Sequence, residues 1–218
     1  MLDPAFYGAL TITKSITIMG VEGASAGRNA ADNGITINAG PDDTVSLSYL
    51  TVDGFKTAKN GILLNSAGSL RITNCKVQNF TINGILIQPS SGTTALLIAD
   101  TAVTNNGAAG ISLFPKVTGV VKGAVERVLL NRNGGSGLET NRNTNDTRVN
   151  VTVADSVATN NSVGYSAASQ GILRLVRSVA SDNVTGVFVN TTAESAGNNT
   201  IRGNGTNIAG FMSNAGTQ

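Results

Sequence analysis

The sequence of 218 residues contains no histidine, no tryptophan and a single cysteine, and each of these absences excludes a class of site. Without histidine, the chain cannot form a Ser-His-Asp triad, a His-ligated zinc site or a haem site with a proximal histidine. The single Cys75 excludes a disulfide bond within the chain and any metal site built from paired cysteines. Many enzyme classes are therefore excluded before any positive feature is considered.

Charged residues are also scarce, at 13% of the chain, whereas a typical soluble domain is roughly a quarter charged. The formal net charge is +2, and aromatic residues make up 4%. Nucleic-acid binding and intrinsic disorder both require more charge than this. No apolar run approaches the roughly 20 residues of a membrane-spanning helix, and the first residues lack the pattern of a signal peptide. We therefore expect neither a nucleic acid nor a membrane as a partner.

Glycine is plentiful, with 26 residues, and many of the glycines mark an internal repeat. The segment NGITINA at 33–39 recurs, for example as NGILLNS at 60–66 and NGILIQP at 83–89. A second unit recurs between these segments, for example as NCKVQN at 74–79 and DSVATN at 155–160. The repeating glycines are Gly34, Gly61, Gly84, Gly110, Gly137, Gly164 and Gly186. The second unit ends at Asp53, Asn79, Asn105, Asn131, Asn160 and Asp182.

Apolar residues within each repeat alternate with a period of two, so that Ile62 and Leu64 point to one side and Leu63 to the other. About three such runs per repeat, separated by Gly, Asn and Asp, predict three short strands and no helix. A leucine-rich repeat has a similar length, but its LxxLxLxxN frame is absent. We therefore predict an all-β solenoid of about seven to eight coils, with parallel strands stacked between successive coils.

The predicted domain is single and spans residues 1–218. Residues 33–206 are predicted to form regular coils, residues 1–20 a first coil or cap, and residues 207–218 the C-terminal end. Stacking turns equivalent residues into columns. The Asn and Asp column suits a tight bend because Asn tolerates left-handed dihedrals, and the glycine column suits a positive φ or close packing. A column of small inward residues is also predicted, at Cys75, Thr101, Ser156 and Ser178.

The pattern NGIxIxx followed by DSxVxNN, repeated over roughly residues 10–206, resembles the right-handed parallel β-helix of the pectate-lyase-like superfamily. This superfamily includes pectate lyases, polygalacturonases, phage tailspikes and adhesins, so the resemblance implies the fold and leaves the function open. It also implies an extracellular or periplasmic location. A lyase of this kind would use Ca²⁺ held by several carboxylates and an arginine as the base, and no other cofactor is expected.

The resemblance implies that ligands bind along the outside of one sheet, at the outward residues of the NGIxIxN strands. Their predicted outward column is Thr36, Leu63, Leu86, Ser112, Glu139, Ser166 and Phe188. A glycosidase needs two carboxyl groups, and this column contains only one. The predicted substrate-binding group consists of Glu139, Arg142, Lys116, Asn141 and Phe114, with Arg127 and Arg132 one repeat earlier. Arginine would bind a carboxylated sugar in a bidentate manner, and the competing interpretation is a surface ion pair.

Two further features are candidate sites. Asp42 and Asp43, with Asp32 and Asp53 in neighbouring segments, form the densest acidic group and a weak candidate for Ca²⁺, against the simpler interpretation of a solvated turn. Leu63, Leu86 and Phe114 in adjacent coils predict an exposed apolar interaction strip, unless the segment at 116–123 folds over it. The ends of a coil stack also expose unpaired strands and favour self-association.

These observations favour a β-helix protein without catalytic activity that presents an extended surface to a polysaccharide or a protein. The first alternative is a polysaccharide lyase acting on an acidic glycan. The second alternative is a structural or adhesin-like element that assembles through its coil ends or its apolar strip.

Overall fold

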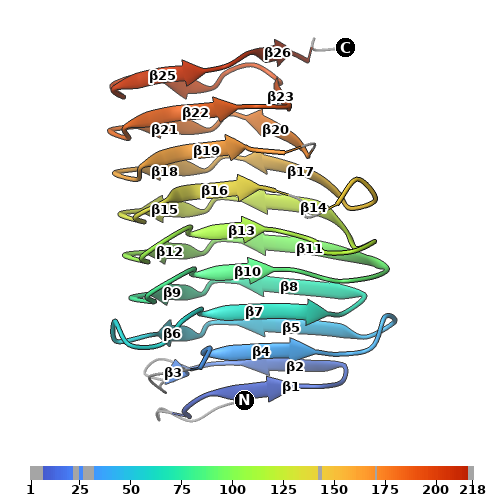
Figure 1. Cartoon of the computed structure of the whole chain (residues 1–218). Helices are drawn as coiled ribbons and strands as arrows, with labels where there is room; N and C mark the ends of the chain where they lie inside the picture. The colour runs from blue at the N-terminus through green and yellow to red at the C-terminus, as the bar shows by residue number, and fades with distance from the viewer. Residues whose placement is uncertain (1–6, 22–24, 27–31, 142–143, 170, 216–218) are drawn as a thin grey trace.

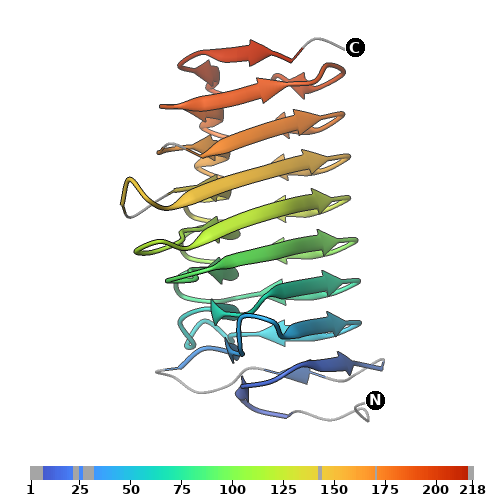
Figure 2. The same ribbon diagram turned by 90° about the vertical axis from the view of Figure 1, so that its right-hand side faces the viewer.

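The computed structural model describes residues 7–21, 25–26, 32–141, 144–169 and 171–215, which wind into a stack of parallel strands (Figure 1). Each coil contributes strands to three sheets in turn, and the coils lie one above another along a rod (Figure 2). Strand β1 (Leu10–Ile12) lies at one end of the rod and β26 (Met212–Asn214) at the other (Figure 1). The predicted all-β parallel solenoid is confirmed.

Three long sheets form the sides of the rod, with nine strands in sheets 1 and 2 and eight in sheet 3 among the described residues. Sheet 1 contains β1, β4 (Ile35–Asn38), β7 (Ile62–Ser66), β10 (Ile85–Ile87), β13 (Ile111–Leu113), β16 (Ser136–Thr140), β19 (Val163–Ala167), β22 (Thr185–Val189) and β25 (Thr206–Ala209). Sheet 2 contains β2 (Ile16–Met19), β5 (Thr44–Ser48), β8 (Ser69–Thr73), β11 (Thr93–Ala99), β14 (Val120–Glu126), β17 (Arg148–Ala154), β20 (Ile172–Val176), β23 (Thr192–Ser195) and β26. Sheet 3 contains β3 (Ser25–Ala26), β6 (Thr51–Asp53), β9 (Lys76–Gln78), β12 (Ala102–Thr104), β15 (Leu129–Asn131), β18 (Val157–Thr159), β21 (Val179–Ser181) and β24 (Thr200–Ile201).

Strands also form outside the range predicted for regular coils. At the N-terminal end β1 pairs with β4 and β2 pairs with β5, and at the C-terminal end β26 pairs with β23. The sheets therefore exceed the expected seven to eight coils slightly. One continuous hydrophobic cluster fills the interior from Ile12 to Ala193. The described part of the chain contains no helix that is long and apolar enough to cross a membrane.

Inward residues of sheet 1 stack in register and form one wall of the core. Ile85 of β10 aligns with Ile62 on one side and Ile111 on the other, and all three are fully buried. Alternate residues such as Ile87 and Leu64 form a second buried column beside the first. Burial of each such side chain stabilises the fold by roughly 1.5–3 kcal/mol, so the period-two pattern of the sequence produces the core directly.

The repeating glycines also stack in register, because each precedes an aligned strand residue of sheet 1. None of the seven has a positive φ. A Cβ atom added to Gly84 would lie 2.4 Å from Cγ1 of Val103 and 2.8 Å from the carbonyl oxygen of Gly110. Of the two reasons predicted for this column, close packing of one coil on the next is therefore the correct one.

Two corners of each coil contain residues with left-handed dihedrals. At the corner between sheets 2 and 3 these residues are Tyr49, Asn74, Asp100, Arg127, Asp155, Arg177 and Asn198. At the corner between sheets 3 and 1 they are Phe55, Lys56, Asn79, Asn105, Arg132, Asn160 and Asp182. Both corners lie on the surface, and their side chains point out of the rod.

The predicted Asn and Asp column needs a correction at two of its members. Asn131 aligns with Thr104 and Thr159, and Asp53 aligns with Gln78, so both lie one residue before the left-handed position. Arg132 occupies that position instead, with φ 55° between Asn105 and Asn160. The prediction was wrong here because it aligned residues by type. Asn131 follows Asn105 by 26 residues, as Asn105 follows Asn79, but the structurally aligned residue is Arg132, one position later.

A second set of asparagines lies immediately after the left-handed column and is buried. The amide Nδ2 of Asn133 donates to Oδ1 of Asn161, and Oδ1 of Asn133 accepts from the backbone and side-chain amides of Asn106. The whole ladder consists of Asn106, Asn133, Asn161, Asn183 and Asn204. A shorter ladder of Asn33, Asn60 and Asn83 precedes the glycine column. In both ladders the side chains other than Asn33 accept hydrogen bonds from backbone amides that the turn would otherwise leave unpaired.

The small inward column at the sheet 2–3 corner is buried as expected. The backbone amide of Cys75 donates to Oγ1 of Thr101, and the backbone amide of Ser156 donates to Oγ of Ser178. Burial raises the pKa of the Cys75 thiol, which keeps the thiol protonated and poorly reactive. Cys75 is therefore a packing residue.

Candidate functional site

The outward column of sheet 1 is aligned as predicted. Leu63, Leu86, Ser112, Glu139 and Ser166 face one another across successive strand pairs. Oγ of Ser112 donates to Oε1 of Glu139 over 2.8 Å, and no ion pair among the described residues includes Glu139. The carboxylate of Glu139 is thus held in place by a hydroxyl group of the neighbouring coil.

The residues predicted to surround Glu139 are distributed over several parts of the surface. Lys116 lies in the turn between β13 and β14, where its backbone amide donates to the carbonyl of Pro89. Phe114 and Asn141 follow β13 and β16, and Oδ1 of Asn141 accepts from Ser169. Arg142 lies outside the described residues. The described positions border the sheet 1 face, in the segments that follow β13 and β16.

Arg127 and Arg132 do not join Glu139. Arg127 lies at the sheet 2–3 corner, and Arg132 lies at the sheet 3–1 corner. The prediction that both arginines support Glu139 was wrong because proximity in the repeat does not give proximity around the coil.

The predicted apolar strip is not an exposed patch. Leu63 is 9% exposed, and Leu86 and Phe114 are half-buried. Leu63 and Leu86 share one column, but the next member of that column is Ser112, and Phe114 lies two residues further along. The segment at 116–123 forms a turn and the start of β14, so it does not cover the strip either.

Asp42 and Asp43 form a turn between β4 and β5. Oδ1 of Asp43 accepts from the backbone amide and the hydroxyl of Ser15, and Oδ2 accepts from the backbone amide of Gly40 over 2.7 Å. These hydrogen bonds, led by that of the Ser15 hydroxyl, lower the pKa of Asp43. No group of three or more His, Cys, Asp or Glu side chains that could hold a metal ion occurs within the described ranges. The hydrogen bonds of Asp43 agree with the simpler interpretation of a turn.

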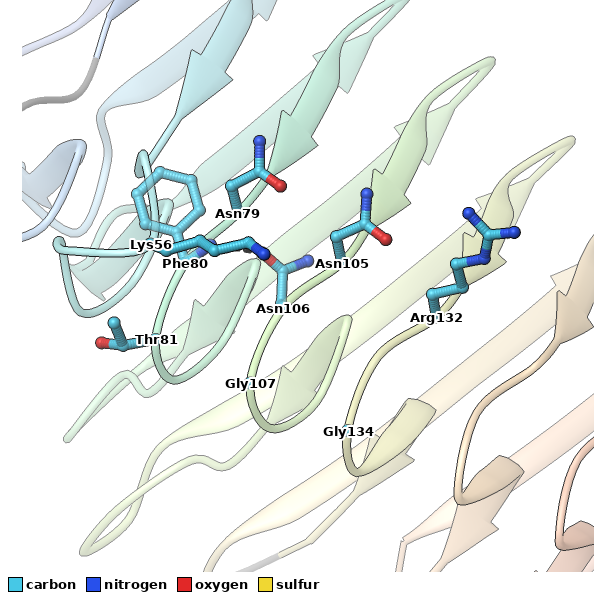
Figure 3. Close-up of a pocket in the computed structure, with 9 residues that line it drawn as sticks. All are labelled: Lys56, Asn79, Phe80, Thr81, Asn105, Asn106, Gly107, Arg132 and Gly134. Atoms are coloured by element: carbon cyan, nitrogen blue, oxygen red, sulfur yellow. Dashed lines mark hydrogen bonds between the residues drawn. The ribbon is translucent and has the colours of Figure 1, made fainter.

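A groove lies along the sheet 3–1 corner, and sequence reasoning missed it. Its volume is about 630 Å³. It is lined by Lys56, Asn79, Phe80, Thr81, Asn105, Asn106, Gly107, Arg132 and Gly134. Figure 3 shows Asn79, Asn105 and Arg132 side by side, each projecting from its own coil in the same direction. We call Lys56, Asn79, Asn105 and Arg132 the corner row.

Local contacts position each member of the corner row. Strands β9, β12 and β15 end one residue before Asn79, Asn105 and Arg132, and the left-handed turn then directs each side chain outward. Lys56 lies in the preceding coil, after β6, where the connection to β7 is longer, and its backbone amide donates to the carbonyl of Asn79 over 2.7 Å. Phe80 is 2% exposed and packs beneath the row against Gly54 and Gly61. In the sequence, the Asn and Asp residues that end the second repeat unit were the signal that could have identified this site.

The arginines of the two corners differ in their partners. Arg127 donates from Nε and Nη2 to both carboxylate oxygens of Asp100, at 2.7 and 2.9 Å, and Arg177 binds Asp155 in the same way. These hydrogen bonds lower the pKa of Asp100 and Asp155 and raise the pKa of both guanidinium groups. Arg132 has no such ion pair among the described residues.

A family model described as a right-handed β-helix region matches residues 60–218. The chain belongs to the right-handed β-helix family. The pectate-lyase-like resemblance of its repeats is consistent with this family, whose fold carries proteins of many activities. Neither the search of curated proteins nor the search of solved structures found a match to this chain. In this member of the right-handed β-helix family, the candidate binding side chains lie on the outward column of sheet 1 and in the corner row.

Proposed function

We propose that this β-helix binds an extended polysaccharide along its outer surface, without cleaving it, and that the corner row is the principal contact. The observation that carries this proposal is the spacing of polar side chains in the groove of about 630 Å³. Asn79, Asn105 and Arg132 follow one another at the separation of neighbouring strands, about 4.7–4.9 Å. A polymer that repeats its hydroxyl groups can contact several of these side chains at once, which raises avidity.

Free hydrogen-bonding capacity in the row supports binding. Asn79 is engaged with Asp53, because its Nδ2 donates to that carboxylate over 3.1 Å. Asn105 is exposed and makes no side-chain hydrogen bond within the described structure, so its amide group offers both a donor and an acceptor. The buried Asn106 below the row is fixed by the ladder, so the floor of the groove is rigid.

A second polar row lies on the border between sheets 1 and 2. Nδ2 of Asn65 donates to Oδ1 of Asn38 over 2.8 Å, and Nε2 of Gln88 donates to Oδ1 of Asn65 over 2.9 Å. These linked amides form a second polar row on another side of the rod. A surface with several rows of this kind suits a long polymer better than a small ligand.

The acidic residues near the proposed surface favour binding over hydrolysis. Glycoside hydrolysis uses two carboxyl groups that flank the scissile bond. Glu139 is the single acid in the outward column of sheet 1, and its carboxylate accepts a hydrogen bond from Ser112. Asp53, beside the corner row, accepts hydrogen bonds from Gln78 and Asn79. The two carboxylates lie on different faces of the coil and cannot flank one bond.

The proposal is tested by screening the purified protein against a panel of neutral and charged polysaccharides, with parallel assays for new reducing ends and unsaturated products. We expect binding without cleavage, and weaker binding for a Lys56→Ala, Asn105→Ala double variant. Asn74→Ala is the matched control for Asn105→Ala, because Asn74 has the same left-handed conformation at the other corner. Retention of no polysaccharide, or release of products, would contradict the proposal.

A further inference from the structure

We infer that the groove at the sheet 3–1 corner is an anion-recognition site, and that Arg132 selects carboxylate or sulfate groups carried by a sugar chain. This inference rests on the proposed function and narrows its ligand class. The groove lies at a corner, away from the outward column of sheet 1 that contains Glu139. Three arginines share one backbone conformation, but only two of them form an ion pair with an aspartate.

Arg127, Arg177 and Arg132 all have left-handed dihedrals, with φ of 51°, 44° and 55°. Arg127 and Arg177 each stack on an aspartate of the preceding coil, which neutralises their charge. The neighbours of Arg132 in its column are Asn105 and Asn160, which carry no charge. The guanidinium group of Arg132 is therefore exposed, without an ion pair among the described residues, at one end of the corner row.

The fold does not require an arginine at this position. Left-handed dihedrals are more favourable for Asn than for Arg, and Asn occupies the same position in three neighbouring coils, at Asn79, Asn105 and Asn160. Replacing Arg132 with Asn would therefore preserve or improve the local backbone energy. Because local backbone stability does not require an arginine at position 132, we attribute its presence to an external ligand.

The groove has the charge that such a ligand requires. Its lining contains two cations, Lys56 and Arg132, and no acid. The backbones of Lys56 and Arg132 are three strand spacings apart in the stack, or about 14 Å along the rod. The nearby Asp53 is already bound by the amides of Gln78 and Asn79. Arginine binds planar carboxylates and sulfate-like groups through two parallel N–H donors, which gives selectivity as well as affinity.

A nucleic acid fits this groove poorly. Single-stranded nucleic acids bind through exposed aromatic side chains that stack on the bases, in addition to cations. The one aromatic residue in the lining, Phe80, is 2% exposed and packs into the core. The net charge of +2 is also small, so the attraction is confined to the corner row. An anionic sugar chain needs no stacking partner of this kind.

The test compares three polymers with one backbone: unmodified dextran, carboxymethyl-dextran and dextran sulfate. Binding of the whole chain to each is measured by biolayer interferometry at low and high salt. We expect at least one charged polymer to bind about tenfold or more tightly than dextran, and Arg132→Asn to reduce that binding by about tenfold or more. Comparison of the two charged polymers identifies carboxylate or sulfate as the preferred group.

Two variants serve as controls. Arg127→Asn removes the same charge from the other corner and should leave binding within about twofold, because Arg127 does not line the groove. Arg132→Lys keeps the charge without the planar pair of donors and should lose part of the affinity. The melting temperature of Arg132→Asn should equal or exceed that of the wild type, which separates a binding role from a structural one.

Three results would overturn the inference: unchanged binding by Arg132→Asn, an equal loss in Arg127→Asn, or binding of unmodified dextran as tight as that of its charged derivatives. Absence of binding to both charged polymers would overturn it as well. If a neutral polysaccharide from the wider panel binds and depends on Asn105, the proposed function stands and only the anion selectivity fails.

Discussion

The packing environment of each side chain in this protein is formed mainly by the residues one coil above and one coil below. Tyr165 shows this clearly, because it is fully buried in the column that contains Leu138 and Val187. Ala158 and Ala180 occupy the inward positions of sheet 3 in the same region, and Ala167 lies in the adjacent column of sheet 1. One large side chain thus fills the space that three small ones leave.

The hydroxyl group of Tyr165 is buried without a hydrogen-bond partner among the described residues. Ser178 lies nearby, but its hydroxyl donates to the carbonyl of Val176. Burial raises the pKa of Tyr165 far above its ordinary value. Tyr165→Phe should therefore increase the free energy of unfolding by about 1 kcal/mol, since it removes an unsatisfied polar group. Urea denaturation measures this, and a decrease of similar size would show that the hydroxyl has a partner.

Gly84 allows neighbouring coils to approach each other. Gly84→Ala places a methyl group 2.4 Å from Cγ1 of Val103 and should lower the free energy of unfolding by about 2–4 kcal/mol. Gly203→Asn is the control. Gly203 has φ 73° with open space around its Cα, and Asn is common at its column position. Thermal denaturation should show a large loss for the first variant and a change within about 0.5 kcal/mol for the second. Equal losses would contradict the packing argument.

At the scale of the structural element, the corners are built from columns of hydrogen bonds that run along the rod. The ladder passes from the buried Asn106 to the half-buried Asn204. The amides before Asn204 each accept from the coil below and donate to the coil above. Phe80 ends this ladder, since its backbone amide donates to Asn106 while its ring packs against the glycines. The ladders therefore transmit the register of one coil to the next.

Asn133 lies in the middle of this ladder and is 2% exposed. Asn133→Ala leaves the amides of Asn106 without their acceptor and should lower the free energy of unfolding by about 2–4 kcal/mol. Asn131→Ala is the control, because Asn131 accepts a single exposed bond of 3.3 Å from Asn160. Combining Asn133→Ala with Asn161→Ala should cost less than the sum of the two changes. Strict additivity would argue against a continuous ladder.

The carboxylates of the turns determine the response to acid. The folded-state pKa values of Asp43, Asp100 and Asp155 are lowered, so their stabilisation is complete above the ordinary aspartate pKa. That stabilisation is lost as the pH falls through the lowered values. We expect stability to be nearly constant between about pH 5 and 8, since the chain has no histidine, and to fall below about pH 4.

A triple variant with Asn at Asp43, Asp100 and Asp155 tests this account of the acid response. It should be less stable than the wild type at neutral pH and should show a shallower loss below about pH 4. The measurement is the melting temperature from pH 3 to pH 8 for both proteins. Parallel acid profiles would mean that other carboxylates dominate.

At the scale of the whole molecule, the repeat pattern predicted the fold well. The period of two in NGILLNS identified the inward residues of β7, and the recurring glycines identified which coils pack closely. The site was predicted less well. The sequence shows which residues repeat, but the distance around the coil between Glu139 and Arg132 depends on corners whose lengths vary by single residues.

The error at Asn131 has the same origin. Asn131 and Arg132 are adjacent, and both types of residue occur at corners, but only the strand pairing of Thr104 with Asn131 assigns the left-handed position to Arg132. An alignment of the repeats by residue type can be wrong by one position and still match asparagine with asparagine. The shift matters because it places an arginine, and not an asparagine, at the end of the groove.

The central claim, that successive repeats stack in register, is tested most directly by distances between spin labels on the outer face of sheet 3. Thr51, Val157, Val179 and Thr200 belong to one aligned outward column, and Cys75 is buried. Labels at Thr51 and Val157 should lie about 19 Å apart, and each further coil, to Val179 and then Thr200, should add about 4.8 Å. Distances that did not increase by one strand spacing per repeat would contradict the account.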